Sequence, residues 1–331
     1  MESTSDSSQI ADLVAGIKRR ERACLAEALN LVDDRRPVAH EQAAKLLQEL
    51  EQASLAAHSH LIGLTGPPGA GKSTLTAALI SLWRQRGRRV GVLAVDPSSP
   101  ISGGALLGDR LRMKISAGDD CVFIRSLASR GEYGGLSAEV WPMSLVMLAA
   151  FDVVLIETVG VGQREIDVAS ICDTTCYVAQ PGSGDSIQFL KAGIMEVPHL
   201  LVVNKEDMGA VARRTLAELG TALGKAHADG NWEVPVLAAS ATVGSGIDEV
   251  ADALLKHWET LIKTEQLVRR RRRSQARWII KRIRDEFGSQ GISRLGGEVE
   301  LMQRISVQRR SLFEQHETLR LILLETGETH A

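Results

Sequence analysis

The stretch that decides the fold is Gly66-Pro67-Pro68-Gly69-Ala70-Gly71-Lys72-Ser73-Thr74, which matches the pattern G-x-x-x-x-G-K-[ST]. An apolar run at residues 61–64 precedes it and a helical pattern follows over residues 73–85. Between a strand and a helix, such glycines let the backbone turn tightly and aim N–H groups at phosphate oxygens. We expect Lys72 to reach the β- and γ-phosphates and the Ser73 hydroxyl to ligate Mg²⁺.

A second motif indicates which base accompanies those phosphates. The apolar run at 200–203 leads into Asn204-Lys205-Glu206-Asp207, the pattern N-K-x-D, at the end of a predicted strand. A carboxylate at Asp207 can accept hydrogen bonds from N1–H and the exocyclic amine of guanine, whereas adenine offers neither donor there. We expect the Lys205 stem to cover the face of the base. Backbone N–H groups of Ser240-Ala241-Thr242, after another apolar run, are expected to meet the guanine O6 edge. The predicted ligand is GTP or GDP.

Two acidic residues, Asp96 and Glu157, each follow an apolar run that reads as an interior strand. Both are expected to face the phosphates and their Mg²⁺, with Glu157 in the place of a Walker-B carboxylate. The Gly160 N–H is expected to meet the γ-phosphate. Asp109, in the long segment between the two, is either a further metal or water ligand or an ordinary loop acid. Gln163 is a candidate for orienting the hydrolytic water.

The pattern around these motifs predicts an α/β fold of the P-loop NTPase type, doubly wound around a mainly parallel sheet. Near-continuous apolar runs alternate with helical stretches, which is typical of parallel strands covered on both faces. The predicted strands cover residues 61–64, 90–95, 153–156, 176–179, 200–203 and 234–237. The predicted helices cover residues 73–85, 137–150, 184–195, 210–223 and 247–262.

Three regions are predicted along the chain. Residues 1–58 form an N-terminal helical region in which Pro37 ends the first helix. Residues 59–265 form the nucleotide-binding domain, and residues 266–331 form two or three further helices. The arginine run at 269–273 is either a solvated helix face or a contact for an acidic partner or phosphates.

Composition excludes several classes of function. With 39 Lys plus Arg and 41 Asp plus Glu the formal charge is −2, which argues against a protein that coats nucleic acid or anionic membranes. Aromatic residues make up only 4%, too few for base-stacking platforms. The polar, acidic start of the chain does not read as a signal peptide, and no apolar run reaches about 18 residues. We expect a cytoplasmic protein without a nucleic-acid or membrane partner.

Taken together and in this order, the motifs resemble the MeaB/ArgK family of P-loop GTPases, to which the human methylmalonic aciduria type A protein belongs. These proteins are chaperones of adenosylcobalamin-dependent acyl-CoA mutases. The matching strings are GPPGAGKST (66–74), VGVLAVDPSSPISGGALLGDRLRM (90–113), ETVGVGQREIDVA (157–169), PGSGDSIQFLKAGIMEV (181–197), VVNKED (202–207) and SATVGSGIDEV (240–250).

The resemblance implies a slow GTP hydrolase, stimulated by a partner mutase, whose activity gates cofactor loading and protects or reactivates that mutase. It implies Mg²⁺ and GTP on residues 66–74, with Asp96, Asp109 and Glu157 around the metal and the hydrolytic water, and guanine reading by Asn204, Lys205 and Asp207. It also implies an additional switch over residues 182–191, where Asp185, Gln188 and Lys191 couple nucleotide state to the mutase. Finally, it implies a homodimer through the C-terminal helices.

Some stretches depart from the usual wording of the family, namely RSLASRGEYGG (125–135), Gln180-Pro181 and Ser186-Ile187. They lie in regions expected to face a partner, so the acyl-CoA substrate of that mutase stays open. Three alternatives also stay open. One is a kinase or ATPase acting on a transport protein, which the N-K-x-D motif disfavours. Another is a metallochaperone GTPase, which the scattered histidines disfavour. The last is an adaptor with vestigial nucleotide binding.

Overall fold

The structure is a computed structural model that describes residues 2–34, 36–53, 58–96, 119–128, 139–158, 164–183, 198–223, 227–228, 232–307 and 311–328. The chain divides into two compact units. The helical unit comprises Met1–His58, Ala138–Ala150 and Val268–Ala331, and the sheet unit comprises Ser59–Ser137 and Phe151–Leu267.

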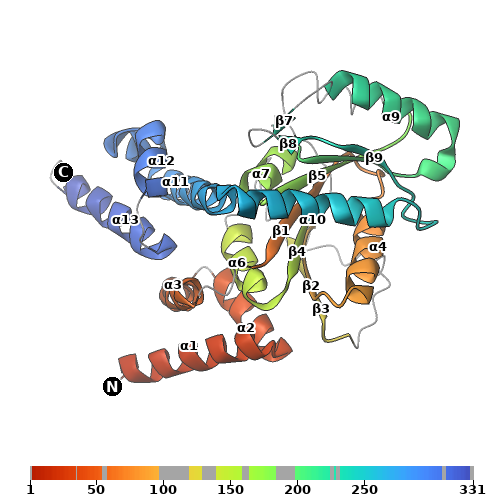
Figure 1. The fold of residues 1–331 in the computed structure, drawn as a ribbon. Coiled ribbons are helices and arrows are strands. Elements are labelled where there is room, and N and C mark those ends of the chain that lie inside the picture. Colours follow the sequence, from red (N-terminus) through yellow and green to blue (C-terminus); the bar gives the residue numbers. More distant parts are fainter. Residues whose placement is uncertain are drawn as a thin grey trace, which may run out of the picture. The chain divides into compact units, whose positions relative to one another are not determined.

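The sheet unit is built on a parallel sheet (Figure 1). Among the described residues it has seven strands in the order β3-β2-β4-β1-β5-β6-β9. Because all these strands run the same way, their carboxyl ends meet at one edge, with β1 in the middle. The strands are β1 (His60–Thr65), β2 (Val90–Asp96), β3 (Val122–Ala128), β4 (Val153–Thr158), β5 (Thr174–Ala179), β6 (Leu200–Val203) and β9 (Val236–Ala238). A separate pair of short strands, β7 (His227–Ala228) and β8 (Trp232–Glu233), is antiparallel.

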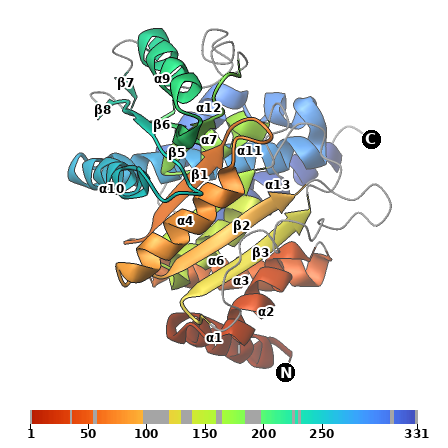
Figure 2. The same cartoon turned by 90° about the vertical axis from the view of Figure 1, so that its right-hand side faces the viewer.

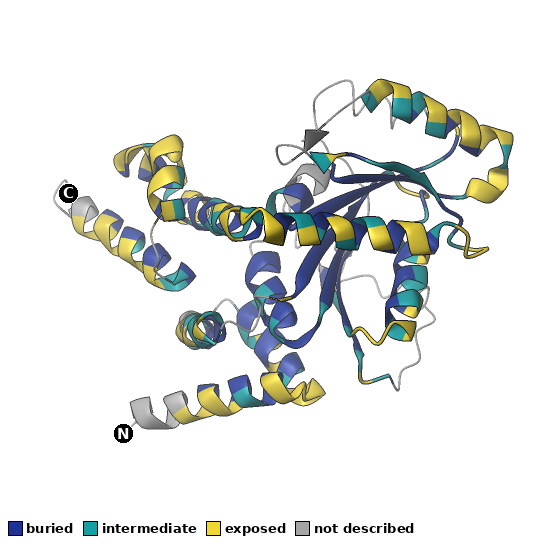
Figure 3. Ribbon diagram, in the orientation of Figure 1, coloured by how far each residue is buried: buried dark blue, intermediate teal, exposed yellow. Residues whose placement is uncertain are grey.

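Helices cover both faces of this sheet because successive strand residues point to opposite sides. On β5, Cys176 and Val178 join the core beneath α4 (Lys72–Gln85) and α10 (Ile247–Lys263). Figure 2 looks onto the face that α4 covers. The alternate residues Tyr177 and Ala179 join the core beneath α9 (Ala210–Leu223) on the other face. This double covering is why the strands are almost uniformly buried (Figure 3). A helix on the α9 side, α7 (Arg164–Ile171), packs so closely on β1 that a Cβ on Gly63 would lie 2.2 Å from Val168 Cγ1.

The helical unit is assembled from both ends of the chain and one internal helix. That helix, α6 (Val140–Ala150), is apolar on all sides, and nearly every residue in it is buried. It packs against the three N-terminal helices, which accounts for its lack of a polar face. The other helices of the unit are α1 (Glu2–Arg19), α2 (Arg22–Asp33), α3 (Pro37–Gln52), α11 (Gln266–Arg294), α12 (Glu298–Val307) and α13 (Leu312–Glu328).

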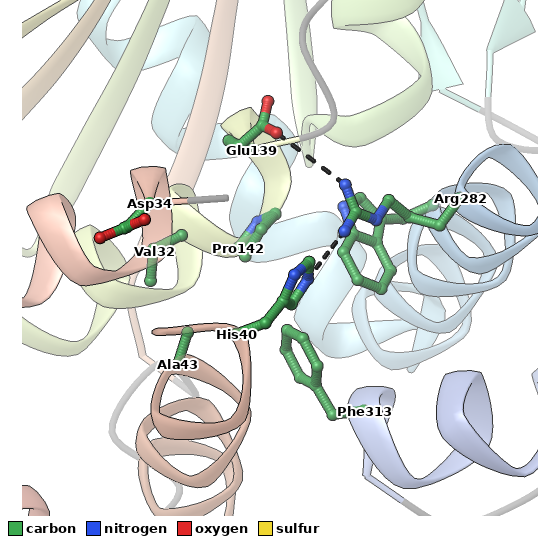
Figure 4. Close-up of a pocket in the computed structure, with 9 residues that line it drawn as sticks. Val32, Asp34, His40, Ala43, Glu139, Pro142, Arg282 and Phe313 are labelled. Carbon is green, nitrogen blue, oxygen red and sulfur yellow. Dashed lines mark hydrogen bonds and ion pairs between the residues drawn. The ribbon is translucent and has the colours of Figure 1, made fainter. Parts of the chain in front are cut away.

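A partly buried polar contact joins three segments of the helical unit (Figure 4). The Arg282 guanidinium of α11 donates from Nη2 to Nε2 of His40 on α3 at 2.7 Å and lies 3.9 Å from Oε1 of Glu139, next to α6. It also lies 5.7 Å from the centre of the Trp278 ring. Burial and the neighbouring Arg282 charge lower the pKa of His40. Because a guanidinium can only donate, His40 Nε2 is the acceptor of this hydrogen bond.

The structure corrects several predicted elements. Pro37 does not end the first helix but begins α3, because the first position of a helix needs no backbone N–H. The N-terminal pattern contains two helices, separated at Arg20, whose φ is +66°. Strand β3 was not predicted because it lies at the edge of the sheet and is only half buried, so polar residues such as Arg125 interrupt its apolar run.

Two other elements need comment. The last predicted strand, 234–237, begins only at Val236, because Pro235 has no N–H to donate to the ladder. The predicted helix over 184–195 lies outside the described residues. The two ends of the chain are predicted to form separate regions, 1–58 and 266–331, whereas the helical unit groups both ends with Ala138–Ala150.

Glu51 of α3 makes the helical unit sensitive to pH. Burial raises the pKa of Glu51 to about 7, although the backbone N–H of Leu312 at the start of α13 opposes this shift. A carboxyl whose pKa is raised on folding stabilises the fold below its unfolded pKa, and that contribution is lost as pH rises through the folded pKa. We therefore expect stability to fall between pH 4.5 and pH 7 by at most about 3 kcal/mol through this residue alone.

The test compares Glu51→Gln with the wild type by urea unfolding from pH 5 to pH 7.5. We expect the variant to become progressively more stable relative to the wild type as pH rises, since the amide cannot ionise. Glu41→Gln, at an exposed position on the same helix, is the control and should show no such trend. A difference between Glu51→Gln and wild type that is independent of pH would contradict the prediction.

Candidate functional site

The loop over residues 66–71 connects β1 to α4 and has the conformation that its glycines allow. Gly66, Gly69 and Gly71 have φ values of +139°, +77° and +88°. A Cβ on Gly66 would lie 2.1 Å from the Val178 carbonyl oxygen, and one on Gly71 would lie 2.4 Å from Asn204 Nδ2. A side chain at either position would therefore strain the backbone and also clash with its neighbours. Pro68 and Gly69 in the loop and Thr74 in the first turn of α4 are exposed.

Lys72 places a positive charge inside this loop. Its side chain is buried, and Nζ donates hydrogen bonds to the carbonyl oxygens of Gly66 at 2.8 Å and Pro67 at 3.0 Å. The ammonium group is therefore held by the first two residues of the loop. A polyanion seated in the loop would meet this charge together with the N-terminus of α4.

Ser73 and Glu157 form a pair of oxygen ligands beside the loop. Ser73 Oγ donates a hydrogen bond of 2.5 Å to Glu157 Oε1, and Glu157 is buried near the end of β4. The two residues meet because β4 is the neighbour of β1, with Glu157 in register with Leu64. A hydroxyl and a carboxylate in contact fit a hard cation such as Mg²⁺, which prefers oxygen ligands.

Asn204, directly after β6, ties the loop to the next part of the site. Its buried side chain donates from Nδ2 to the carbonyl oxygens of Ala70 at 2.9 Å and Gly71 at 3.3 Å, and its Oδ1 accepts the Ala241 N–H at 3.2 Å. The N-K-x-D motif predicts a base contact for Asn204, and no local signal predicts its bridge from the glycine loop to Ala241. The Ala241 N–H, which is predicted to meet the base, is bonded to Asn204 Oδ1.

Asp207 is held at the same edge by a hydroxyl. Ser240 Oγ donates to Asp207 Oδ1 at 2.5 Å, and Ser240 is buried while Asp207 is exposed. Ser240 thereby orients the Asp207 carboxylate. Lys205 has a left-handed backbone (φ +60°), and its Cε lies 4.0 Å from the position of a Cβ on Gly71, so its stem lies against the loop. Thr242, the last of the predicted base-site residues, is exposed in the turn that follows.

The remaining predicted site residues cannot be placed. Asp109, Gly160, Gln163, Asp185, Gln188 and Lys191 lie outside the described residues. Asp96 is the last residue of β2, which pairs with β4, but its side chain is not among those described.

Three histidines that are far apart in the sequence meet at the opposite edge of the sheet, where β1 and β5 begin. The Thr174 hydroxyl lies between His60 Nε2 at 2.6 Å and His257 Nδ1 at 2.8 Å, and the His257 and His199 ring centres are 4.4 Å apart. Within the described part of the chain, no group of three His, Cys, Asp or Glu residues is arranged to hold a metal ion. These histidines are buried core residues that hydrogen-bond to Thr174 or Thr175.

Comparison with known proteins places this chain in a family. A family model described as methylmalonyl Co-A mutase-associated GTPase MeaB matches residues 25–294. GTPase ArgK of Escherichia coli is 36% identical over 283 residues, which are 84% of this chain and 84% of that protein. The mitochondrial methylmalonic aciduria type A homolog of Caenorhabditis elegans is 34% identical over 300 residues, 86% of this chain and 75% of the relative.

A solved structure extends this comparison to the fold. The crystal structure of an LAO/AO transport system kinase is 27% identical and aligns with a TM-score of 0.68 over 95% of this chain and 98% of that chain. The match supports the predicted P-loop fold over nearly the whole chain. Among the described residues, no helix combines the length and apolar composition needed to cross a membrane.

Asn204 is predicted to be essential for the shape of the loop. In Asn204→Asp the buried amide donor is lost, and a carboxylate oxygen faces the carbonyl oxygens of Ala70 and Gly71. We expect the free energy of unfolding to fall by about 2–4 kcal/mol, measured by urea denaturation. Asn30→Asp, at an exposed position on α2, is the matched control. Equal stability of the two variants would show that the bridge does not stabilise the fold.

Proposed function

Because the chain belongs to the MeaB family of methylmalonyl-CoA mutase-associated GTPases, we propose that it binds GTP and GDP at the edge formed by the loop, Asn204 and Asp207, and hydrolyses GTP there. We further propose that the nucleotide state gates its action as a chaperone of an adenosylcobalamin-dependent acyl-CoA mutase. The observation that carries the nucleotide assignment is the hydrogen-bonded bridge that Asn204 makes between the glycine loop and Ala241. This bridge holds the proposed phosphate site and the proposed base site next to each other.

Hydrolysis in this site rests on positioning and charge. The backbone N–H groups of the loop and the Lys72 ammonium bind the phosphate oxygens and stabilise the charge that builds up as the terminal phosphoryl group is transferred to water. Ser73 and Glu157 would hold Mg²⁺, which when bound neutralises phosphate charge. Asp207 accepts the two guanine donors, and Ser240 keeps its carboxylate oriented. We propose from the family alone that GTP hydrolysis is slow and that the partner mutase stimulates it.

The mutase partner is proposed from the description of the family. The test follows the inactivation of a purified methylmalonyl-CoA mutase during turnover, alone and with this protein plus GTP or GDP. We expect nucleotide-dependent protection, and a pull-down from the native cell extract should recover an acyl-CoA mutase. Absence of protection for every acyl-CoA mutase recovered or tested would reject the chaperone role.

One alternative has an observation in its favour, since the solved relative is described as a transport system kinase. A kinase would transfer the terminal phosphate to a protein side chain, whereas a GTPase transfers it to water. Incubation with γ-labelled GTP and ATP distinguishes the two. Label that stays on protein would favour the kinase, and release of inorganic phosphate from GTP alone would favour the GTPase.

Asp207→Asn is predicted to abolish guanine recognition. The amide offers one acceptor where guanine presents two donors, and its own N–H would face one of them. We expect the affinity for GTP and GDP to fall at least about 100-fold, measured by fluorescent nucleotide binding. Glu206→Gln, in the same turn but bonded to Ser245, is the control. Mutase protection by Asp207→Asn equal to that of the wild type would contradict nucleotide gating.

A homodimer through the C-terminal helices is part of the proposal. Leu321, Ile322 and Leu324 on α13 are 40–49% exposed, although they are large and apolar. In Leu321→Glu/Leu324→Glu we expect the dimer dissociation constant, measured by sedimentation, to rise at least about 10-fold. Val38→Glu, another exposed apolar position in the helical unit, is the control. An unchanged dimer in the double variant would place the interface elsewhere.

A further inference from the structure

The side chain of Gln180, part of a departure from the usual wording of the family, lies beside the glycine loop. It directly follows β5, the strand next to β1. Its Oε1 lies 3.3 Å from the position that a Cβ on Gly69 would occupy. The side chain therefore reaches the exposed middle of the loop from the side of β5.

The backbone that carries Gln180 is fixed on both sides. On one side it continues β5, and on the other it enters a turn in which the Ser183 N–H donates to the Gln180 carbonyl oxygen at 3.3 Å. The Gly182 N–H in this turn donates to Thr215 Oγ1 of α9 at 3.0 Å. Pro181 between them is buried and has a restricted φ. The Gln180 side chain thus starts from a defined position beside the loop.

The amide of Gln180 has unused hydrogen-bonding groups. Within the part of the chain that the structure describes, it makes no side-chain hydrogen bond, although an amide offers two N–H donors and one acceptor. Asn204, the amide at the end of the next strand, differs because it is buried and bonded on both sides by the protein. Gln180 is only half buried, so a ligand in the loop can reach it.

The order of the strands indicates which part of a nucleotide lies beside Gln180. The Ser73–Glu157 pair, proposed for Mg²⁺, lies on the β4 side of the loop. Gln180 lies on the opposite side, between the loop and β6, which leads to the base-reading residues. Lys205 approaches Gly71 from that same side. Gln180 therefore lies beside the part of a bound nucleotide between the terminal phosphates and the base, which GTP and GDP have in common.

We propose that Gln180 is a further nucleotide-binding residue, whose side-chain amide hydrogen-bonds the phosphate–ribose portion that GTP and GDP share. This inference rests on the proposed function, since it requires a guanine nucleotide in the loop. A contact made equally to substrate and product contributes uniform binding: it lowers the dissociation constants without changing the rate of the bound complex. Gln180 therefore sets how tightly either nucleotide is held.

The test uses Gln180→Leu, which keeps the size of the side chain and removes its polar groups. We expect the dissociation constants of fluorescent GDP and GTP to rise by a similar factor, about 5–10-fold, with the single-turnover rate at saturating GTP unchanged within about twofold. The thermal midpoint should stay unchanged, because Gln180 makes no side-chain hydrogen bond to the described residues. Gln85→Leu, at the exposed far end of α4, is the matched control.

Gln180→Glu provides a second readout, the pH dependence of GDP affinity, which a merely structural role of this residue would not change. Its carboxylate has the same shape as the amide but repels phosphates when ionised. We expect the affinity for GDP, relative to wild type, to decrease as pH rises from about 5 to about 8. Gln180→Leu should show no such trend relative to the wild type.

The outcomes separate this inference from the proposed function. If the wild type binds neither GTP nor GDP, the proposed function fails. If the wild type binds both and the two Gln180 variants bind them within about twofold of it at every pH, only the role of Gln180 is overturned. A loss confined to GTP would also overturn it, since it would place the amide on the terminal phosphate.

Discussion

The site depends on one buried side chain, the amide of Asn204. A tight glycine loop turns several backbone carbonyl groups away from regular secondary structure, and buried carbonyls that lack partners are costly. Asn204 bonds those of Ala70 and Gly71 and, through its oxygen, the N–H of Ala241. One residue at the end of β6 thereby fixes the loop after β1 and the turn after β9 relative to each other. Glycine is required at position 71 for the same reason, because a Cβ there would occupy the place of the amide.

The electrostatics of the site agree with the near-zero net charge of the chain. A highly charged ligand would be met by backbone N–H groups, by one helix terminus and by the buried ammonium of Lys72, which the loop carbonyls hold in place. Such a site needs no large basic surface. The acidic residues have distinct surroundings: Glu157 is buried against the Ser73 hydroxyl, and Asp207 is exposed but oriented by Ser240.

The chain passes between the two units more than once. After β3 the chain leaves the sheet unit, contributes the fully apolar helix α6 to the helical unit and returns as β4, which carries Glu157 near its end. Within the helical unit, Arg282 bonds His40 and lies near Glu139 at the start of this insertion. The chain therefore passes between the two units on either side of α6, next to a strand of the candidate site, as well as at the junctions 58–59 and 267–268.

The sequence by itself determined the elements whose signals are local. Apolar runs predict the parallel sheet and the helix over 210–223. The strand, glycine loop and helix around residues 66–74 follow from a spacing that only a few residue types satisfy. The family resemblance, on the same motifs, is confirmed by the match over residues 25–294. The sequence does not predict the edge strand β3 or the start of α3 at Pro37, because half-buried edge strands and helix starts have weaker local signals.

Only the tertiary structure decided what depends on residues distant in sequence. Asn204 reaches back across more than a hundred residues to the loop, Ser240 orients Asp207, and Gln180 lies against Gly69. Three dispersed histidines meet in the core, two of them through the Thr174 hydroxyl and the third by stacking on the His257 ring. No periodicity records these contacts, because each arises from the order in which parallel strands are placed side by side. That order is set by the packing of whole elements rather than by any neighbouring residues in the chain.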